Sequence, residues 1–174
     1  TVKVDGTSTT LSMDERGQVH VYSRNWELDS MSSNMQLAKR FQLDKMLWPG
    51  MAVQFELCGP GIQSNRLKLP AQRPFVFAVW KDHHKIDRNQ WPTGMPNLAV
   101  PELDENEWAL TGSVDDMIAK VDGLRGNVTK DRLDEGIVWH LHEDQQLSEG
   151  LANELGSNRC FKIINNKSLT KNGL

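Results

Sequence analysis

The sequence predicts an α+β fold with antiparallel sheets flanked by helices. Several short segments alternate apolar and polar residues with period two, which is the pattern of half-buried strands. Three other segments carry helix caps or helical spacing, and they are interspersed without the regular strand–helix–strand rhythm of a parallel sheet. The 174 residues amount to about one domain, and 38% hydrophobic with 25% charged residues is ordinary for a globular protein.

The strand predictions depend on this alternation. Residues 51–58 are the clearest case, because every second residue is apolar while the residues between are polar or small. Within residues 75–80, Phe75, Phe77 and Val79 are predicted to share one face. Shorter strands are predicted at residues 19–22, 136–141 and 161–165.

Two further stretches are assigned from composition. Residues 2–11 are rich in Val and Thr, and we expect them to form a hairpin with the segment that follows Arg16 and Gly17. Residues 81–107 are polar and contain three prolines and Trp91, so we expect a long surface excursion.

Three helices are predicted. The first covers residues 35–48, with Asn34 before it and a Pro-Gly pair behind it. The second begins at an N-cap, Ser113, with Asp116 at the third helical position. The third is indicated by leucines at four-residue spacing, and Gly156 matches a C-terminal stop. These leucines are Leu147, Leu151 and Leu155.

The bulk properties restrict the function classes. The net charge of −3 excludes a surface that is basic throughout, so any nucleic-acid binding is expected at a local patch or pocket. No run approaches the roughly 18 apolar residues of a membrane helix, and the start lacks a signal-peptide pattern. Neither Cys58 nor Cys160 belongs to a CxxC pair. We interpret both as reduced and the protein as intracellular and cytoplasmic.

The string KVDG occurs twice, at residues 3–6 and 120–123. The first copy runs into a β-prone Thr/Ser segment, which places Lys3 and Asp5 on the same side of a strand. The second copy ends the helix that follows Ser113, where Asp-Gly indicates a stop and a turn. A lone KVDG is weak evidence of function, so the strings that follow each copy decide between them.

Five strings follow the first copy in order: SRNWEL (23–28), FELCGPGIQSNRL (55–67), FVFAVW (75–80), EGIVW (135–139) and FKIINNKSLTK (161–171). This series resembles the covalent nucleotidyltransferase superfamily of ligases and capping enzymes over nearly the whole chain. SRN and GPGIQ resemble the nick-sealing, ATP-dependent RNA ligases rather than DNA ligases. The resemblance implies a ligase-type nucleotidyltransferase fold, ATP-grasp-like, with the ATP pocket between antiparallel sheets. Only the last two strings follow Lys120, so the resemblance selects Lys3.

The resemblance implies RNA ligase adenylyltransferase activity with Lys3 as the nucleophile. A lysine amine attacks the α-phosphorus of ATP only when neutral, a form that nearby cations or burial favour. Lysyl-AMP would form, AMP would pass to an RNA 5′-phosphate, and a 3′-hydroxyl would displace AMP and seal the strand. Each step builds negative charge on phosphate oxygens, so Mg²⁺ (or Mn²⁺) and fixed cations are expected to supply most of the stabilisation.

The resemblance also assigns residues to the nucleotide. Asp5 and Gly6 belong to the motif around the nucleophile. Arg24 would lie at a ribose, and Glu56 would contact ribose hydroxyls or a metal-bound water. Phe77 would stack on the adenine.

Further residues are assigned to phosphate, metal and nucleic acid. Lys162 would contact the α-phosphate, and Glu135 would help to hold Mg²⁺, which prefers oxygen ligands. The second lysine of this last motif is Lys167 or Lys171, or is absent. Three residues of the loop after Glu56 could face nucleic acid: Gln63, Asn65 and Arg66.

The sequence departs from the family pattern in three places. Val2 stands where related RNA ligases often carry glutamate, which puts an adenine contact in doubt. Ala78 stands where many ligases have aspartate. Ile164 stands where the last motif commonly has its second lysine.

Two other classes remain open. A DNA ligase or an mRNA capping nucleotidyltransferase belongs to the same superfamily, and a comparison of ATP with GTP as adduct donor separates the capping enzyme. A catalytically weak nucleotide- or RNA-binding module could keep the fold without the chemistry, given the departures at Val2 and Ile164.

The partners implied are ATP and RNA, or a nicked duplex with an RNA strand, with no membrane. Nothing in the sequence indicates more than a monomer. We expect residues 1–174 to be one nucleotidyltransferase domain, and a fragment of a longer RNA-repair ligase without its accessory nucleic-acid-binding domain. The isolated domain is therefore expected to form lysyl-AMP better than it seals strands.

Overall fold

The computed structural model describes residues 1–109, 113–141, 149–156 and 160–171. Its contacts divide the chain into two compact units. Unit 1 comprises Thr1–Val4 and Pro101–Leu174, and unit 2 comprises Asp5–Val100. The chain therefore passes from one unit to the other twice, after Val4 and after Val100.

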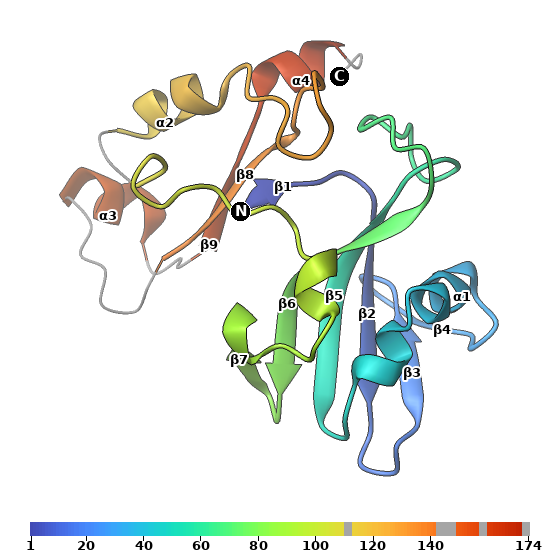
Figure 1. Ribbon diagram of the computed structural model, residues 1–174. Coiled ribbons are helices and arrows are strands. Elements are labelled where there is room, and N and C mark those ends of the chain that lie inside the picture. Colours follow the sequence, from blue (N-terminus) through green and yellow to red (C-terminus); the bar gives the residue numbers. More distant parts are fainter. Residues whose placement is uncertain (110–112, 142–148, 157–159, 172–174) are drawn as a thin grey trace. The chain divides into compact units, whose positions relative to one another are not determined.

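Unit 2 is built on a six-stranded antiparallel sheet in the order β4-β3-β2-β5-β6-β7 (Figure 1). The predicted hairpin is confirmed, since β2 turns back into β3. In this turn the Asp14 carboxylate accepts hydrogen bonds from the backbone N–H groups of Arg16 and Gln18, at 3.0 and 2.7 Å. The six strands are β2 Thr7–Met13, β3 Val19–Tyr22, β4 Glu27–Leu28, β5 Met51–Cys58, β6 Arg73–Lys81 and β7 His84–Ile86.

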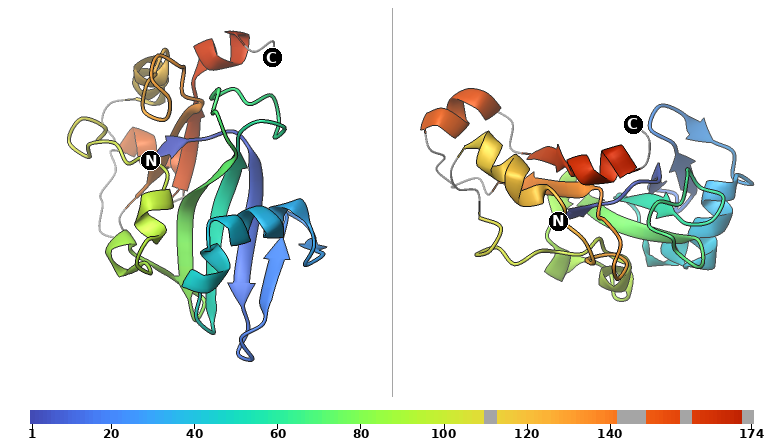
Figure 2. Two further views of the ribbon diagram at one scale, coloured as in Figure 1. Left: turned by 45° about the vertical axis from the view of Figure 1, so that its right-hand side comes forward. Right: turned by 90° about the horizontal axis from the view of Figure 1, so that it is seen from above.

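The core of unit 2 lies on one face of this sheet. Strand β5 pairs with β2 on one side and β6 on the other, and its alternate residues are buried as predicted. The helix α1 Ser33–Arg40 and the short 3-10 helix η1 Leu43–Met46 share one core with these strands (Figure 2). The core residues of β5 are Met51, Val53, Phe55 and Leu57.

Strand β6 differs from its predicted alternation. A bulge shifts the register between β5 and β6, so that Val76 joins the core together with Val79. Phe75 pairs with Glu56, and both lie on the face of the sheet that points away from the core of unit 2. Phe77 is the extra residue of the bulge. The prediction that Phe75, Phe77 and Val79 share a face is therefore wrong. A bulge inserts one residue and inverts the alternation beyond it, which a period-two pattern does not reveal.

The helix predicted over residues 35–48 is shorter and starts earlier. The Ser32 hydroxyl, not Asn34, caps α1 by accepting a hydrogen bond from the Met35 N–H at 3.4 Å. The Asn34 amide instead donates to the Thr9 hydroxyl at 2.7 Å. Gln42 adopts the left-handed conformation with φ 58°, which interrupts the helical hydrogen bonds and separates α1 from η1.

The predicted surface excursion at residues 81–107 is in part a cover for the core. It contains β7 and the 3-10 helices η2 Arg88–Gln90 and η3 Met95–Leu98. Trp91 and Met95 are buried in the core of unit 2. Trp91 and Met95 stand apart in a polar segment with prolines, and they form no periodic apolar pattern. Their burial could therefore not be predicted from the sequence pattern.

Unit 1 is built on a three-stranded antiparallel sheet in the order β1-β8-β9 (Figure 1). Its strands are β1 Val2–Lys3, β8 Gly136–His140 and β9 Cys160–Ile164. The helices α2 Val114–Val121 and α3 Glu149–Leu155 share a core with one face of the sheet. This core consists of Met117, Val121, Ile137, Trp139, Leu151 and Ile163. The predicted α+β class with antiparallel sheets is thus confirmed.

The helix ends of unit 1 follow the sequence signals. At α2 the Ser113 hydroxyl accepts a hydrogen bond from the Asp116 N–H, and the Asp116 carboxylate accepts one from the Ser113 N–H. Gly156 follows α3 with φ 57°, as a C-terminal stop requires. Leu147 lies outside the described residues. A short helix, α4 Asn166–Lys171, follows β9.

Two further findings concern the whole chain. Within the described residues, no helix combines the length and the hydrophobicity needed to cross a membrane. Cys58 and Cys160 are free thiols, as predicted, the first buried and the second exposed.

Candidate active site

Lys3 and Glu135 form an ion pair within unit 1. Lys3 ends β1 and Glu135 directly precedes β8, so the pairing of Lys3 with Gly136 brings the ammonium beside the carboxylate. Both side chains are largely buried, with exposed fractions of 19% and 13%. The predicted nucleophile and the predicted metal carboxylate, separated by 132 positions in the chain, thus meet at one place.

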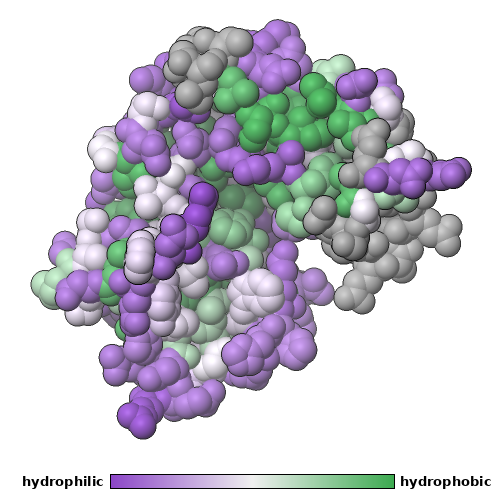
Figure 3. Space-filling model, turned by 180° about the vertical axis from the view of Figure 1, so that it is seen from behind, coloured by the Kyte–Doolittle hydropathy of each residue, from purple (hydrophilic) through white to green (hydrophobic). Residues whose placement is uncertain are grey.

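Strand pairing places Lys162 on the same face of the sheet as Lys3. Lys3 pairs with Gly136, and Lys162 pairs with Val138, two residues further along β8. Lys162 is exposed, whereas its neighbour Ile163 is buried in the core behind the sheet, as the alternation predicts. Figure 3 shows apolar residues gathered in one area of the surface, in the upper part of the view.

A buried amide holds the backbone on both sides of Glu135. The Asn165 side chain donates to the carbonyls of Leu124 and Asp134, both at 3.0 Å, and accepts from the Gly123 N–H at 3.0 Å. The Asn165 N–H donates to the Glu135 carbonyl at 2.8 Å. The side-chain oxygen and nitrogen of Asn165 are both hydrogen-bonded. These bonds fix the backbone that leads into β8 and carries Glu135. Sequence reasoning missed Asn165, whose only signal is a polar residue at the end of an apolar strand.

Asp5 and Gly6 lie in unit 2, at the turn into β2. Gly6 has no room for a side chain, because a Cβ would lie 2.1 Å from the Leu57 carbonyl oxygen. Arg66 Nε lies 3.4 Å from the Asp5 carboxylate, and the Gln63 side chain donates to the Gly6 carbonyl at 3.2 Å. The loop after β5 therefore holds the turn that follows Lys3 in the sequence.

The loop itself is fixed by Asn65. The Asn65 side chain donates to the Leu69 carbonyl and accepts from the Leu69 N–H, both at 3.1 Å. The three residues predicted to face nucleic acid, Gln63, Asn65 and Arg66, thus all bond within unit 2. Their contact with nucleic acid stays a prediction.

Glu56 and Phe77 belong to the sheet of unit 2. Glu56 is half-buried on the face opposite the core, between Ser8 and Phe75 in the ladder. Phe77 is half-buried in the bulge, so it is not a fully buried core residue.

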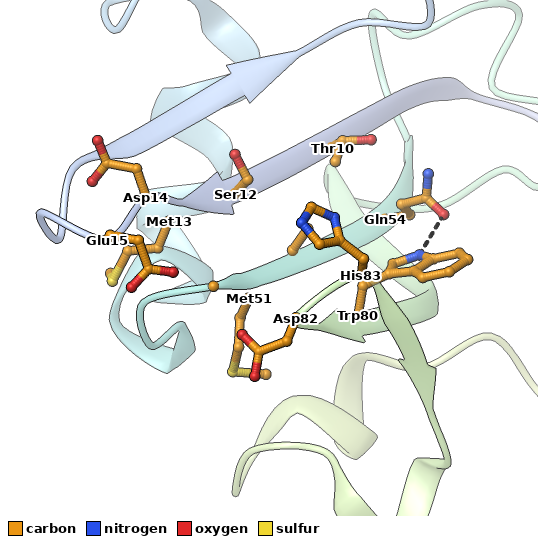
Figure 4. Close-up of a pocket in the computed structure, with 12 residues that line it drawn as sticks. Thr10, Ser12, Met13, Asp14, Glu15, Met51, Gln54, Trp80, Asp82 and His83 are labelled. Carbon is orange, nitrogen blue, oxygen red and sulfur yellow. Dashed lines mark hydrogen bonds between the residues drawn. The ribbon is translucent and has the colours of Figure 1, made fainter.

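An open pocket of about 710 Å³ lies further along the polar face of the same sheet (Figure 4). The Trp80 indole N–H donates to the Gln54 side chain at 3.0 Å in its floor. Its wall includes three carboxylates and one histidine: Asp14, Glu15, Asp82 and His83. Acidic walls repel the phosphates of a nucleotide, so this pocket is not the candidate site.

Arg24 and Lys167 are not brought to Lys3 by any described contact. Arg24 lies exposed in the turn between β3 and β4, in unit 2. Lys167 lies in α4 with its ammonium 3.2 Å from the Asp122 carboxylate, which also accepts a hydrogen bond from the Lys167 N–H. The side chain of Lys171 lies outside the described part of the chain.

The second KVDG copy has structural roles. Its aspartate, Asp122, binds the first turn of α4 through Lys167. Its lysine, Lys120, lies over the Trp108 ring at 4.6 Å and donates to the Glu107 carbonyl. Asp122 is the C-cap of α2, so the prediction that this copy ends a helix is confirmed, and the choice of Lys3 over Lys120 as the nucleophile stays a prediction.

Glu135 offers an oxygen for a metal ion. Its Oε2 atom is buried and meets no hydrogen-bond donor among the described residues, while Oε1 pairs with Lys3. The same part of the chain contains no cluster of three or more His, Cys, Asp or Glu side chains suited to a metal. Mg²⁺ needs no such cluster, because it keeps several waters and binds through one or two carboxylates and substrate phosphates.

A family model described as RNA ligase matches residues 1–164. The chain belongs to the RNA ligase family. The match contains Lys3, Glu135 and Lys162, which the sheet of unit 1 groups together. A comparison of the chain with curated proteins found no match.

The chain is similar, over 98% of its own length, to solved structures of the Naegleria gruberi RNA ligase. The structure with pyrophosphate shares 25% identity at a TM-score of 0.72. The structure of a lysine-to-alanine variant with ATP and manganese shares 26% sequence identity at a TM-score of 0.73. The structure of a lysine-to-methionine variant with AMP and manganese shares 25% identity at a TM-score of 0.72. The chain spans about half the length of these ligases, 49% to 50%.

Proposed function

We propose that this chain is the adenylyltransferase domain of an ATP-dependent RNA ligase. The observation that carries the proposal is the Lys3–Glu135 ion pair, with Lys162 on the same face of the sheet. Membership of the RNA ligase family, and relatives solved with ATP, AMP and manganese, support the same chemistry. The proposed substrates are ATP and an RNA 5′-phosphate. We also propose an intracellular monomer, which the two free thiols support in part.

The first step forms a covalent adduct on Lys3. The lone pair of Nζ attacks the α-phosphorus of ATP, an N–P bond forms, and the bond to the bridging oxygen breaks so that pyrophosphate leaves. The ammonium must lose one proton before the attack and a second one as the phosphoramidate forms. Glu135 already bonds this ammonium and is therefore the group of unit 1 placed to accept a proton.

Two further transfers complete the proposed reaction. An oxygen of the RNA 5′-phosphate attacks the phosphorus of lysyl-AMP, which frees Lys3 and leaves AMP on the RNA through a new pyrophosphate linkage. A 3′-hydroxyl oxygen then attacks the RNA phosphate, loses its proton, and AMP departs as a phosphodiester forms. Lys162 is proposed to bind the α-phosphate throughout, because an ammonium on this face neutralises charge at the reacting phosphorus.

Glu135 is the residue proposed to hold Mg²⁺ or Mn²⁺. Its buried Oε2, which has no partner among the described residues, fits a hard divalent cation. When bound, such a cation supplies positive charge beside the phosphate oxygens.

The remaining family assignments are proposed for the nucleotide. Phe77, displaced from the core by the bulge, is proposed to stack on the adenine. Glu56 is proposed at the ribose hydroxyls or a metal-bound water, and Arg24 at a ribose. Gly6, which accepts no side chain, and Asp5 shape the turn after the nucleophile. Lys167 could serve as the second cation only by leaving Asp122.

Intact mass after incubation with ATP and Mg²⁺ tests the proposal. The parent protein should gain one AMP, and Lys3→Ala should gain none. Lys120→Ala is the matched control, since it removes the lysine of the other KVDG copy, and it should keep the adduct. An adduct that survives in Lys3→Ala and disappears in Lys120→Ala would overturn the assignment.

The same assay separates the competing classes. GTP in place of ATP should give no adduct, whereas a capping nucleotidyltransferase would prefer it. A binding module would bind ATP without any mass gain. Transfer of AMP to a 5′-phosphorylated DNA strand in preference to RNA would favour a DNA ligase.

A further inference from the structure

A loop of unit 1 exposes three cationic side chains. Residues 124–134, which connect α2 with β8 and are here named the basic loop, expose Arg125, Lys130 and Arg132 against a single exposed carboxylate, Asp131. The whole chain, by contrast, has a net charge of −3. In the described structure, none of the three cations lies within ion-pair distance of a carboxylate; Arg125 Nε has only a 3.4 Å contact with the Gly123 carbonyl.

The backbone of the basic loop is ordered as a small hairpin. Arg125 and Leu133 form an antiparallel bridge, and the Gly126 N–H donates to the Arg132 carbonyl at 2.9 Å. The Arg132 N–H donates to the Thr129 carbonyl at 3.1 Å and closes the turn. This pairing places Leu133 opposite Arg125, with Arg132 next to Leu133 in the chain and Lys130 at the turn.

A buried carboxylate fixes this hairpin from within. Asp134 is fully buried and accepts hydrogen bonds from the Asn127 N–H at 3.2 Å, the Asn127 side-chain amide at 2.8 Å and the Val128 N–H at 3.3 Å. Burial of a carboxylate is unfavourable unless donors satisfy it, so these bonds hold the loop in one arrangement. Asn165 anchors both ends, through the Leu124 and Asp134 carbonyls. A charge run that is only solvated needs no such internal support.

We propose that the basic loop binds the phosphate backbone of the RNA substrate. The inference rests on the proposed RNA ligase function, and it adds a surface outside the residues assigned to the nucleotide. Glu135 follows the loop directly and pairs with Lys3, so RNA phosphates on the loop lie next to the reacting end of the strand. Preorganised arginines and a lysine bind phosphates without a loss of loop entropy. Because the rest of the chain is acidic on balance, local cations are the means to hold a polyanion.

The test compares two triple variants with the parent. Arg125→Gln/Lys130→Gln/Arg132→Gln removes the cations of the basic loop. Lys39→Gln/Arg40→Gln/Lys45→Gln is the matched control, since it removes three exposed cations from α1 and η1 in unit 2. Binding of a fluorescent, nicked RNA duplex with a 5′-phosphate is measured across a salt series. Thermal melting confirms that each variant is folded, and intact mass with ATP and Mg²⁺ records lysyl-AMP.

The basic-loop variant should lower the slope of log affinity against log salt by about 2, and weaken binding by about ten-fold at low salt. It should still form lysyl-AMP, and the control should keep both properties. An unchanged slope, an equal loss in the control, or loss of lysyl-AMP with an unchanged slope would each overturn the proposal. A parent that binds RNA through this loop but forms no lysyl-AMP would instead overturn the proposed function alone.

Discussion

At the scale of single residues, the two oxygens of Glu135 have different surroundings. Oε1 pairs with the Lys3 ammonium, and Oε2 is buried without a donor among the described residues. One carboxylate therefore has an oxygen for Lys3, the proposed nucleophile, and a second oxygen for the proposed cation. We therefore expect the charge of Glu135, rather than its shape, to matter for the proposed adduct formation.

Glu135→Gln should separate charge from shape. The amide keeps the size of the side chain but cannot bind a divalent cation as a carboxylate does, so lysyl-AMP formation should fall by about 100-fold. The rate of AMP incorporation across a Mg²⁺ or Mn²⁺ titration measures the effect, with the exposed Glu105→Gln as control. A variant that keeps the parental rate and metal dependence would remove Glu135 from the metal site.

His20 provides a pH-dependent contact at the edge of unit 2. Its ring nitrogens lie 2.8 Å from the Glu27 carboxylate and 3.6 Å from the Asp14 carboxylate. The hydrogen bond with Glu27 raises the pKa of His20 above its usual value, desolvation opposes the rise, and Asp14 adds to it. Because the folded pKa is raised, this contribution to stability is complete below pH ~6.5 and is lost as pH rises through the folded pKa.

An NMR titration of the His20 ring should therefore give a pKa above the ordinary histidine value. Melting temperature against pH should show a small loss of stability as pH rises through that pKa, and His20→Gln should remove this dependence. A His20 pKa at or below the ordinary value would contradict the reading of its two carboxylate neighbours.

At the scale of elements, Lys3 and Glu135 of the candidate site lie at the ends of strands rather than in their middle. Glu135 directly precedes β8, and Lys3, the proposed nucleophile, is the last residue of β1. Gly136, which begins β8, admits no side chain, since a Cβ would lie 2.1 Å from the Ile163 carbonyl oxygen. The close approach of β8 and β9 at this point lets Asn165 reach the backbone beside Glu135.

Asn165→Ala tests this support. It removes the side-chain partner of the Gly123 N–H and of the Asp134 carbonyl, while the Leu124 carbonyl keeps the Asp134 N–H, so the free energy of unfolding should fall by about 2–4 kcal/mol. Urea unfolding measures the loss, and Asn97→Ala, at an exposed asparagine of η3, should change stability by less than ~0.5 kcal/mol. Equal stability of the two variants would show that the buried amide does not hold the strand entry.

At the scale of the whole molecule, the chain passes between its two units at two points. One passage lies directly after β1, within the KVDG string that contains Lys3. The loop after β5 binds this string on the unit 2 side, through Arg66 and Gln63. Lys3 lies in unit 1, one residue before Val4, which ends the first segment of that unit.

The length of the chain leads to a prediction about activity. It spans about half of the solved RNA ligases that it resembles, and the residues proposed for adduct formation lie within it. We therefore expect lysyl-AMP formation to be efficient and sealing of nicked RNA to be weak. Parallel assays of adduct mass and of sealed product test this expectation, and sealing as fast as adduct formation would contradict it.

The residues of the candidate site were assigned from short strings in the sequence. Lys3, Glu135 and Lys162 were assigned from ordered motifs, and the sheet of unit 1 brings Lys3 to Glu135 and sets Lys162 on their face. The strand of residues 51–58 was predicted with its correct ends, because one buried face imposes a strict alternation. These features depend on neighbours along the chain, which a sequence displays directly.

Other features depend on neighbours in space, and only the tertiary structure decided them. The bulge that moves Phe77 out of the core, the left-handed Gln42 that divides the first helix, and the burial of Trp91 follow from how separate strands and loops pack. Asn165 acquires its role only when β9 lies beside β8. The sequence by itself determined the family and the fold class, since local pattern encodes them, and it supplied the prediction that Lys3 is the nucleophile. Register, support and the basic loop's internal bonds arise from long-range contacts, which no local pattern encodes.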